Sequence, residues 1–296
     1  MAIPYTQAEA DELGVHTSKK DGGNWRYVED IYKKDGGTWR TAKEVWYKSG
    51  GTWRLVHEGE HFLFKTTLST NSESEWSLSS YITGQGYSGN KIKGVVVINN
   101  KQQRVNLNNY QNTSRILLVV NNGKKISGRG GKGGNASGQN GQNGQRALYS
   151  GGTPFKLNNA GVIAGGGGGG GAGNHGQCSY QTTQYVSCMK GQQCAQQQTQ
   201  YSQSGGGGGG GGAGYPGGTG VDGGQNGQET GGGGGGGNGG CGAQSGGKGG
   251  NLGQNGQNAT NGGNGAGHGT GIQGINHRYE QVMYGDGDIR GGTSNT

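Results

Sequence analysis

The first half of the chain alternates short apolar runs with polar stretches. Four runs are rich in β-branched and aromatic residues, a composition typical of β-strands. They cover residues 62–68, 91–99, 104–107 and 115–120. We expect these strands to form a small β module spanning residues 59–122, which connects the parts on either side of it.

A short helix is expected near the N-terminus. Thr6 and Glu9 have the spacing of a capping box, in which each side chain hydrogen-bonds the other residue's backbone N–H. Gly14 stands where a helix C-terminal stop would fall. The sequence therefore predicts a helix over residues 7–13.

A five-residue motif occurs three times in residues 1–58. Gly-Gly-x-Trp-Arg stands at 22–26, 36–40 and 50–54, and a turn-forming Asp or Ser precedes each Gly pair. Turn residues between alternating β-prone segments are the short-range signal of a β-hairpin. We therefore expect three consecutive hairpins.

Each hairpin presents a Trp from the same position. An isolated hairpin is marginally stable in water, so these side chains must pack together or against a partner. The Trp side chains could pack against each other as a small hydrophobic core of the three hairpins. Alternatively, a threefold repeat could match a threefold-symmetric partner, with the Trp residues as binding anchors. The attachment residues are Trp25, Trp39, Trp53 and the neighbouring Trp46.

Composition changes sharply near residue 123. The chain has 76 Gly and 27% hydrophobic residues, so a conventional close-packed core cannot occupy its whole length. Only 12 Gly precede residue 123, whereas all five Trp do. We expect a separate Gly-rich domain over residues 123–296.

Glycine in this domain recurs every third residue, as in Gly-Gln-Asn repeats, or fills uninterrupted runs. Flexible linkers are one explanation. The alternative is a set of rods with three residues per turn, hydrogen-bonded to each other. A rod with neighbours on one side needs Gly at every third position, whereas an enclosed rod needs it everywhere. The runs 165–171, 205–212 and 231–237 are then the interior layer.

Together these elements resemble a known family. Gly-Gly-x-Trp-Arg hairpins, the 128–134 and 246–250 Gly/basic segments and three long Gly runs resemble the receptor-recognising tip adhesin of T-even-type phage long tail fibres. The resemblance implies a mainly β and irregular fold with little α-helix, in which residues 123–296 form a polyglycine II sandwich. It implies a virion protein at the fibre tip, made in the host cytoplasm.

The resemblance also implies partners and contact residues. The N-terminal repeats would attach one copy to a trimeric fibre protein, and loops between rods would bind a porin-type outer-membrane protein of a Gram-negative host. The interruptions are 146–160, 174–204, 214–222 and 272–285, and we favour the second and fourth as the tip. Some of their aromatic residues could instead cover the rod ends. The predicted contact residues are Tyr180, Tyr185, Tyr201, His277, Arg278, Tyr279, Met283, Tyr284, Tyr149, Phe155 and Tyr215.

Residues for catalysis, metals or cofactors are not grouped in the sequence. No Asp or Glu lies between Glu75 and Asp222, which removes paired carboxylates from half of the chain. Four Cys permit three disulfide pairings, and Cys188 and Cys194 are close enough to close a loop. We expect no enzymatic activity, no metal and no cofactor.

Net charge and hydropathy bear on the partners. The net charge of +8 is expected to favour encounter with anionic lipopolysaccharide, and no nucleic-acid partner is expected. Two alternatives stay open: a basic nucleic-acid-binding protein, and a Gly-rich protein that binds ice or other surfaces. No secretion signal or membrane-spanning run is visible.

Overall fold

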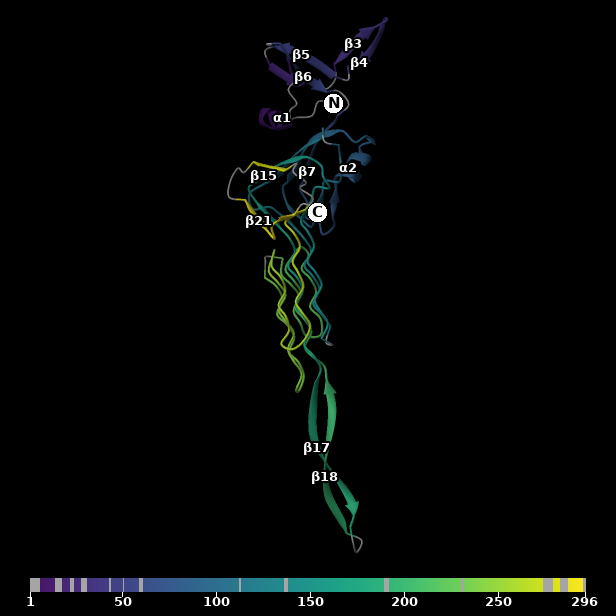
Figure 1. The fold of residues 1–296 in the computed structure, drawn as a ribbon, viewed down its shortest axis with the longest axis vertical. Helices are drawn as coiled ribbons and strands as arrows, with labels where there is room; N and C mark the ends of the chain where they lie inside the picture. Colours follow the sequence, from purple (N-terminus) through teal and green to yellow (C-terminus); the bar gives the residue numbers. More distant parts are fainter. Residues whose placement is uncertain are drawn as a thin grey trace.

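The protein is elongated, and its parts follow one another along the long axis. The computed structural model describes residues 6–13, 18–21, 24–27, 31–42, 44–49, 51–58, 61–111, 113–135, 138–188, 192–229, 232–273, 279–282 and 287–294. Small hairpins lie at one end, followed by a β module, a bundle of Gly-rich segments and a long hairpin (Figure 1). The fold is mainly β; the described residues contain two helices, α1 (Gln7–Leu13) and α2 (Leu78–Gly84).

Helix α1 has the predicted bounds and the predicted cap. The Thr6 backbone N–H donates to Glu9 Oε2 at 2.7 Å, and the Glu9 N–H donates to Thr6 Oγ1 at 3.2 Å. These reciprocal bonds satisfy N–H groups that have no partner inside the helix. The expected stop at Gly14 lies outside the described residues.

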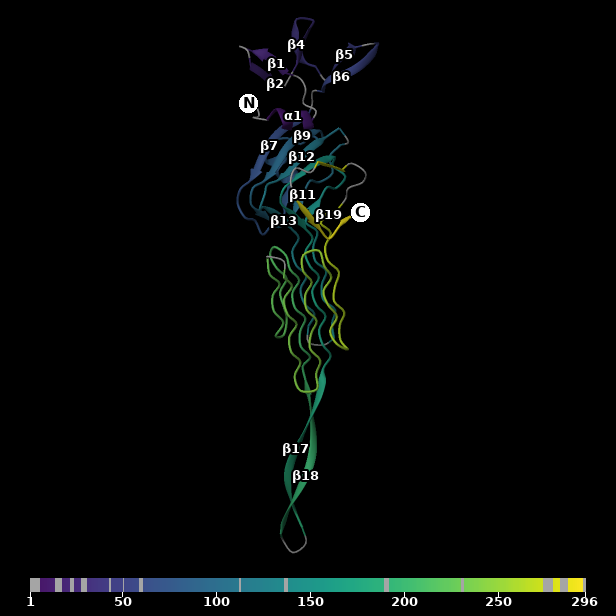
Figure 2. The ribbon, with the colours of Figure 1, turned by 90° about the vertical axis from the view of Figure 1, so that its left-hand side faces the viewer.

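The three predicted hairpins are confirmed, and each is a separate two-stranded antiparallel sheet. Figure 2 shows them splayed apart beyond α1. In the second hairpin, Gly36 and Gly37 have φ of 56° and 87°. Positive φ at both central residues is the geometry that two-residue hairpin turns favour. The strands are β1 (Ser18–Asp21), β2 (Asn24–Tyr27), β3 (Tyr32–Asp35), β4 (Thr38–Thr41), β5 (Glu44–Ser49) and β6 (Thr52–Glu58).

The β module consists of three parallel sheets, which the sequence did not predict. The first has the order β20-β15-β12-β9-β7, the second β10-β13-β16-β21 and the third β22-β19-β14-β11-β8. The first sheet contains β7 (Phe62–Leu68), β9 (Ile92–Ile98), β12 (Arg115–Val120), β15 (Phe155–Asn159) and β20 (Tyr279–Val282). The second contains β10 (Lys101–Gln102), β13 (Lys125–Ser127), β16 (Val162–Ala164) and β21 (Asp288–Arg290). The third contains β8 (Trp76–Ser77), β11 (Val105–Asn106), β14 (Leu148–Tyr149), β19 (Ile272–Gln273) and β22 (Thr293–Ser294).

The chain visits these sheets in a fixed order. After β7 it touches the second sheet at the Ser72–Gln102 bridge and enters the third at β8, and every later turn repeats this path. Successive turns stack in parallel, as in the pairing of Phe62 with Ile92 and of Ile116 with Phe155. The β module is thus a three-faced coil of strands.

Alternating side chains explain the apolar runs of the first sheet. Inward residues such as Val96 and Leu118 are fully buried in the main core of the coil. Outward residues Val95 and Leu117 pack with Leu13 of α1 in a second cluster. Because strands covered on both faces need apolar residues at every position, these runs are continuous rather than alternating.

The Gly-rich segments are insertions into this coil. Residues 128–147 leave between β13 and β14, and residues 165–271 leave between β16 and β19. Strands β13 to β16 and β19 to β22 come from the part of the chain assigned to the Gly-rich domain. The module therefore extends beyond the expected range 59–122, because later turns of the chain return to complete its sheets.

Backbone hydrogen bonds between the inserted segments repeat every third residue. In segment 165–173, three rows of N–H groups face three different neighbours, at N···O distances of 2.7–3.1 Å. A rod with three residues per turn directs successive N–H groups in this way. The predicted period of three is confirmed, and the polyglycine II conformation itself stays a prediction. Gly166, Gly169 and Ala172 donate to 139–145; Gly167, Gly170 and Gly173 donate to 207–213; Gly168 and Gly171 donate to Gln254 and Gln257.

Packing separates enclosed rods from peripheral ones. Residues 165–173 and 206–212 are buried, as expected for interior runs. The third run differs, because only Gly234 and Gly237 of residues 232–237 are buried. The interior prediction was therefore wrong for this run. Its backbone is hydrogen-bonded to residues 208–211, 225–228 and 246–249, but four of its six described Gly residues stay partly exposed.

Asn side chains complete the hydrogen bonding at the periphery. Asn143 Oδ1 accepts from the Gly267 N–H at 2.9 Å, and Asn140 Oδ1 accepts from the Asn264 N–H at 2.8 Å. Asn255 and Asn258 do the same for the N–H groups of His268 and Gly265. In the Gly-Gln-Asn repeats, Gly thus faces a neighbouring backbone while Asn satisfies donors that have no backbone partner.

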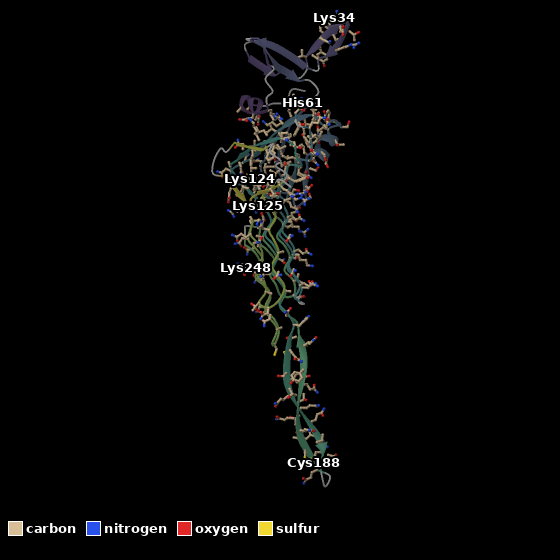
Figure 3. The ribbon with its side chains drawn as sticks, in the orientation of Figure 1. Lys34, His61, Lys124, Lys125, Cys188 and Lys248 are labelled. Atoms are coloured by element: carbon tan, nitrogen blue, oxygen red, sulfur yellow. A yellow bond between two sulfur atoms is a disulfide. The ribbon has the colours of Figure 1, made fainter. Side chains whose placement is uncertain are left out.

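An ion-pair cluster joins the bundle to the module. Lys101 Nζ lies 2.5 Å from Glu229 Oε1, and Lys125 Nζ lies 3.6 Å from the same oxygen and donates to the Glu229 carbonyl at 2.6 Å. Figure 3 shows Lys125 where the module meets the bundle. The Gly-rich segment 224–229 is thereby fixed to β10 and β13.

Candidate functional site

The far end of the molecule is a single antiparallel ribbon. Strands β17 (Gly176–Ser187) and β18 (Gln193–Ser204) pair residue by residue, from Gly176–Ser204 at the bundle to Ser187–Gln193 near the turn. The ribbon projects beyond the bundle along the long axis (Figures 1 and 2). Most of its residues are exposed, so both faces are accessible.

Large side chains are displayed on both faces of this ribbon. Exposed fractions are 68% for Tyr185, 66% for Tyr201 and 49% for Tyr180. Successive residues of a strand point to opposite faces, so Tyr185 and Tyr201 share one face and Tyr180 lies on the other. The Tyr180 hydroxyl donates to Gln200 Oε1 at 3.0 Å. Val186, with 40% exposure, is a further exposed apolar side chain of the ribbon, which the sequence did not single out.

The ribbon surface is polar and almost uncharged. Its two strands contain nine Gln and no Asp, Glu, Lys or Arg. Tyr supplies a large rigid contact area at low entropic cost, and amide side chains form adaptable hydrogen bonds. This combination is suited to protein recognition, and strands β17 and β18 contain no Asp, Glu or His for acid–base chemistry.

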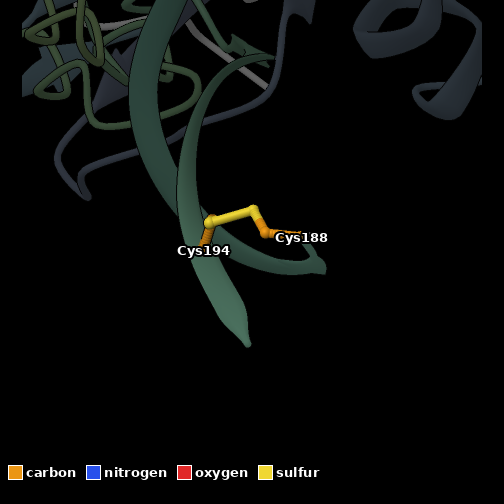
Figure 4. The surroundings of a disulfide bond; sticks show 2 residues. All are labelled: Cys188 and Cys194. Atoms are coloured by element: carbon orange, nitrogen blue, oxygen red, sulfur yellow. A yellow bond between two sulfur atoms is a disulfide. The ribbon is translucent and has the colours of Figure 1, made fainter. Parts of the chain in front are cut away.

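A disulfide closes the turn end of the ribbon. Cys188 and Cys194 are bonded with their Cα atoms 5.8 Å apart, which selects the pairing of nearest Cys from the three that the sequence allowed (Figure 4). Cys178 and Cys241 are free thiols at the base of the ribbon. The Cys178 thiol donates to the Cys241 carbonyl oxygen at 3.1 Å. A side-chain hydrogen bond with the Cys178 thiol raises the pKa of the Cys241 thiol.

The base of the ribbon is held by the bundle. Ser204 Oγ donates to the Cys241 carbonyl, which also accepts from Cys178. The Gly240 N–H donates to the Gly205 carbonyl at 3.0 Å, and the Gln244 N–H donates to the Asn174 carbonyl at 3.2 Å. Both ends of the ribbon are therefore fixed covalently or by hydrogen bonds.

The opposite end presents Trp39 on β4. Its side chain is 65% exposed, and Lys34 Nζ lies 5.9 Å from the ring centroid. Trp39 is therefore not buried in a hydrophobic core formed by the hairpins. The backbones of Trp25, Trp46 and Trp53 lie in β2, β5 and β6, whereas their side chains are outside the described part of the chain.

Comparison with known proteins identifies the family of this chain. A family model described as phage tail fibre adhesin Gp38 matches residues 64–294, which is most of the chain. The chain belongs to the Gp38 family of phage tail fibre adhesins. A solved chain in the gp37–gp38 adhesin tip complex of the bacteriophage S16 long tail fibre is similar, with 20% identity and a TM-score of 0.47, covering 80% of this chain and 84% of that one. No curated protein sequence matches the chain.

Two of the contact residues expected in this Gp38-family adhesin are buried. Phe155 is 3% exposed in the core of the β module, and Tyr215 is 8% exposed, with Lys125 Nζ 5.9 Å from its ring centroid. The prediction that they contact a receptor was wrong. The interruption of the Gly tracts at residues 146–160 predicts a loop, whereas these residues contain strands β14 and β15 of the β module.

Tyr149 of the adhesin is half-buried rather than displayed. It lies in β14 of the third sheet, and the Arg146 guanidinium stacks 4.0 Å from its ring centroid. The Tyr149 ring thus helps to orient an arginine, a role that the sequence did not indicate.

The described part of the expected second tip loop, residues 272–273 and 279–282, lies at the other end of the Gp38-family bundle. These residues form β19 and β20, whose partners β14 and β15 belong to the β module. They are not brought together with the β17–β18 ribbon, because each insertion returns to the coil that it left (Figure 1). Tyr279 begins β20, and His277, Arg278, Met283 and Tyr284 lie outside the described residues.

The described residues of the adhesin contain neither a cluster of metal ligands nor a membrane-spanning helix. Groups of three or more His, Cys, Asp or Glu that could hold a metal ion do not occur there. None of the helices in this part of the chain has the length and apolar character needed to cross a bilayer.

Proposed function

We propose that this protein is the receptor-binding adhesin at the tip of a phage long tail fibre, with the β17–β18 ribbon as its host contact. The observation that supports this most directly is the ribbon's place at the end of the molecule farthest from the Trp-bearing hairpins (Figure 1). One end is then available for the virion while the other meets the cell.

The chemistry of the ribbon fits a protein receptor. Tyr185 and Tyr201 provide aromatic area on one face, and the surrounding Gln residues provide hydrogen bonds without charge. Desolvating neutral amides costs less than desolvating ions. We infer that the receptor is an outer-membrane protein of the porin type, and that the net charge of +8 favours approach to anionic lipopolysaccharide.

The Trp hairpins are the proposed attachment to the fibre. Three hairpins splay from one end, and the described Trp39 is exposed on one of them (Figure 2). A trimeric fibre protein offers three equivalent surfaces, to which three repeats of one chain can bind. A Trp39→Ala variant should co-purify less well with the co-expressed fibre protein, whereas Lys33→Ala should not change co-purification.

This role makes the protein a non-enzymatic virion component synthesised in the host cytoplasm. Membership of the Gp38 family favours it over the two alternatives left open by composition. A protein that binds ice or other surfaces would have no use for an aromatic ribbon. A nucleic-acid-binding protein would concentrate cations on its projecting surface, and the described ribbon residues carry none.

The test compares adsorption of phage that carry variants of the ribbon. Tyr185→Ser/Tyr201→Ser removes the aromatic area of one face, and we expect adsorption to fall at least tenfold because interface aromatics are common binding hot spots. Gln197→Ser on the same face is the matched control and should leave adsorption unchanged.

The source of host preference can be measured separately. Exchange of residues 174–204 for the corresponding segment of a related chain should transfer host preference. Wild-type adsorption by a correctly folded double Tyr variant, or unchanged preference after the exchange, would contradict the proposed contact.

A further inference from the structure

Two adjoining grooves lie where the bundle meets the β module. The first, of about 380 Å³, is lined by Arg104, Arg146 and Gln273 together with 144–145 and 269–270. The second, of about 220 Å³, is lined by Arg129 and Lys132 among polar and Gly residues. Gln145 lines both. The two grooves form one continuous basic surface, which the ribbon's role does not involve.

Arg146 is held rigidly at the wall of the first groove. Its Nη1 donates to Gln273 Oε1 at 2.9 Å, and its guanidinium stacks on the Tyr149 ring at 4.0 Å. Its Nε is buried without a hydrogen-bond partner among the described residues. Burial of an unpaired donor is costly, so this guanidinium is oriented but incompletely satisfied.

Positive charge exceeds negative charge around Arg146. Arg104 pairs with Glu75, whose other oxygen accepts from Asn106 Nδ2 at 2.8 Å. No carboxylate in the described ranges lies within ion-pairing distance of Arg146. Arg129 and Lys132 add two further exposed cations along the adjoining groove.

The two arginines of the first groove also oppose each other. Burial lowers the pKa of the Arg104 guanidinium, and the positive charge of Arg146 lowers it further. A bound anion would reduce this repulsion. Planar guanidinium groups match the geometry of phosphate oxygens, with which they form strong charge-assisted hydrogen bonds.

We propose that the Arg104–Arg146 groove binds a phosphate group, with Arg129 and Lys132 attracting further negative charge alongside it. This chemistry has two sources, a phosphorylated surface saccharide of the host and inorganic phosphate. Only the first source rests on the proposed adhesin function. The exposed Gln145 accepts from Arg104 Nη1 at 3.4 Å through Oε1, and its amide N–H groups are placed to donate to a sugar hydroxyl beside the phosphate.

The experiment measures binding of three probes to the purified full-length protein at low salt. The probes are inorganic phosphate, glucose 6-phosphate and glucose, titrated by calorimetry. We expect both phosphates to bind, glucose not to bind, and affinity to fall as salt increases. Tighter binding of glucose 6-phosphate than of phosphate indicates the saccharide source, and equal binding indicates the free ion.

Substitutions of single residues test whether phosphate binds in the Arg104–Arg146 groove. Arg146→Gln should weaken phosphate binding at least tenfold, and Arg146→Lys should weaken it less because the charge remains. Lys248→Gln, which removes a bundle cation that lines neither groove (Figure 3), should not alter binding. Thermal unfolding of each variant establishes that it is folded.

Two outcomes overturn the proposal: no binding of either phosphate to the wild-type protein, or unchanged binding by folded Arg146→Gln. Neither outcome affects the ribbon, whose contact with the receptor is tested by phage adsorption. Failure of the groove and failure of the adhesin role are therefore distinguishable.

Discussion

At the scale of single residues, the space at each Gly determines whether another residue can replace it. A Cβ on Gly210 would lie 2.1 Å from the Gly234 carbonyl oxygen. A Cβ on Gly235 would meet only the Gln225 side-chain amide, at 3.2 Å from Oε1. Both residues belong to long Gly runs, but only the first has a backbone in the way.

These two sites give a matched pair of substitutions. Gly210→Ala forces two backbones apart, and we expect it to lower the free energy of unfolding by about 1–3 kcal/mol or more. Gly235→Ala should be neutral or slightly stabilising, since Ala has fewer unfolded conformations than Gly. Thermal unfolding measures both. Equal melting temperatures for the two variants would mean that the rods do not pack as described.

Single residues also differ in whether their contacts can be predicted from the sequence. The three-residue Gly period was visible and was sufficient to predict backbone contact between rods. The role of Asn143 could not be predicted, because its Oδ1 accepts from the Gly267 N–H, 124 positions away in the sequence. Phe155 was misassigned for a similar reason, since its burial depends on strands far away in the sequence.

At the scale of elements, the β17–β18 ribbon lacks the neighbouring strands and covering layers that stabilise the strands of the β module. It therefore needs other stabilising contacts. A two-stranded hairpin without a covering layer is marginal in water. The Cys188–Cys194 bond closes a loop of sequence separation 6 at one end, and hydrogen bonds to Cys241 hold the other. The ribbon can therefore stay paired while fully solvated.

Removal of this disulfide should act locally. Cys188→Ser/Cys194→Ser is expected to reduce ribbon stability by about 2 kcal/mol, the loop-closure entropy for a short loop. Amide exchange in 176–187 and 193–204 should accelerate, whereas exchange in the buried rod 206–212 should not. Cys241→Ser serves as the control because it removes a thiol but keeps the turn closed and keeps the Cys241 backbone carbonyl that accepts from the ribbon base. Unchanged exchange in the ribbon would show that pairing does not depend on the disulfide.

Elements with a local signal were predictable and the others were not. Helix α1 has its capping box, and the hairpins have their Gly pairs, so both were found with near-correct bounds. Strands β10, β11 and β14 have two residues each, too few for any periodicity. Their existence depends on parallel neighbours in the coil, which is why the three-sheet topology was absent from the sequence reasoning.

At the scale of the whole molecule, the coil determines where the binding ends lie. Both Gly-rich insertions leave from the edge between the second and third sheets and return to it. The bundle is thereby joined to the module by four chain connections, after β13 and β16 and before β14 and β19. Contacts between Glu229 and the module lysines add a further point of attachment, which is sensitive to pH.

The pH dependence of this attachment follows from the directions of the pKa shifts. The hydrogen bond from Lys101, together with the charge of Lys125, lowers the pKa of the Glu229 carboxyl despite its partial burial. The same contact raises the pKa of Lys101, whereas burial lowers that of Lys125. The stabilisation from Glu229 is therefore complete above the ordinary carboxyl range and is lost as pH falls through its lowered pKa. The contribution of Lys101 is complete below its ordinary pKa and is lost as pH rises through the raised value.

Glu229→Gln tests this attachment directly. The variant should melt at a lower temperature than the wild type near neutral pH, because Lys101 and Lys125 lose their carboxylate partner. The difference should shrink toward zero in acid, where the wild-type carboxyl is protonated as well, and again in strong alkali as Lys101 loses its proton. The effect should be modest, since the Lys101 and Glu229 side chains are 43% and 33% exposed and solvent screens the pair. Asp222→Asn, at another bundle carboxylate, is the control for a general loss of negative charge. A melting difference that is the same at every pH would mean that the pairing of Glu229 does not join the bundle to the module.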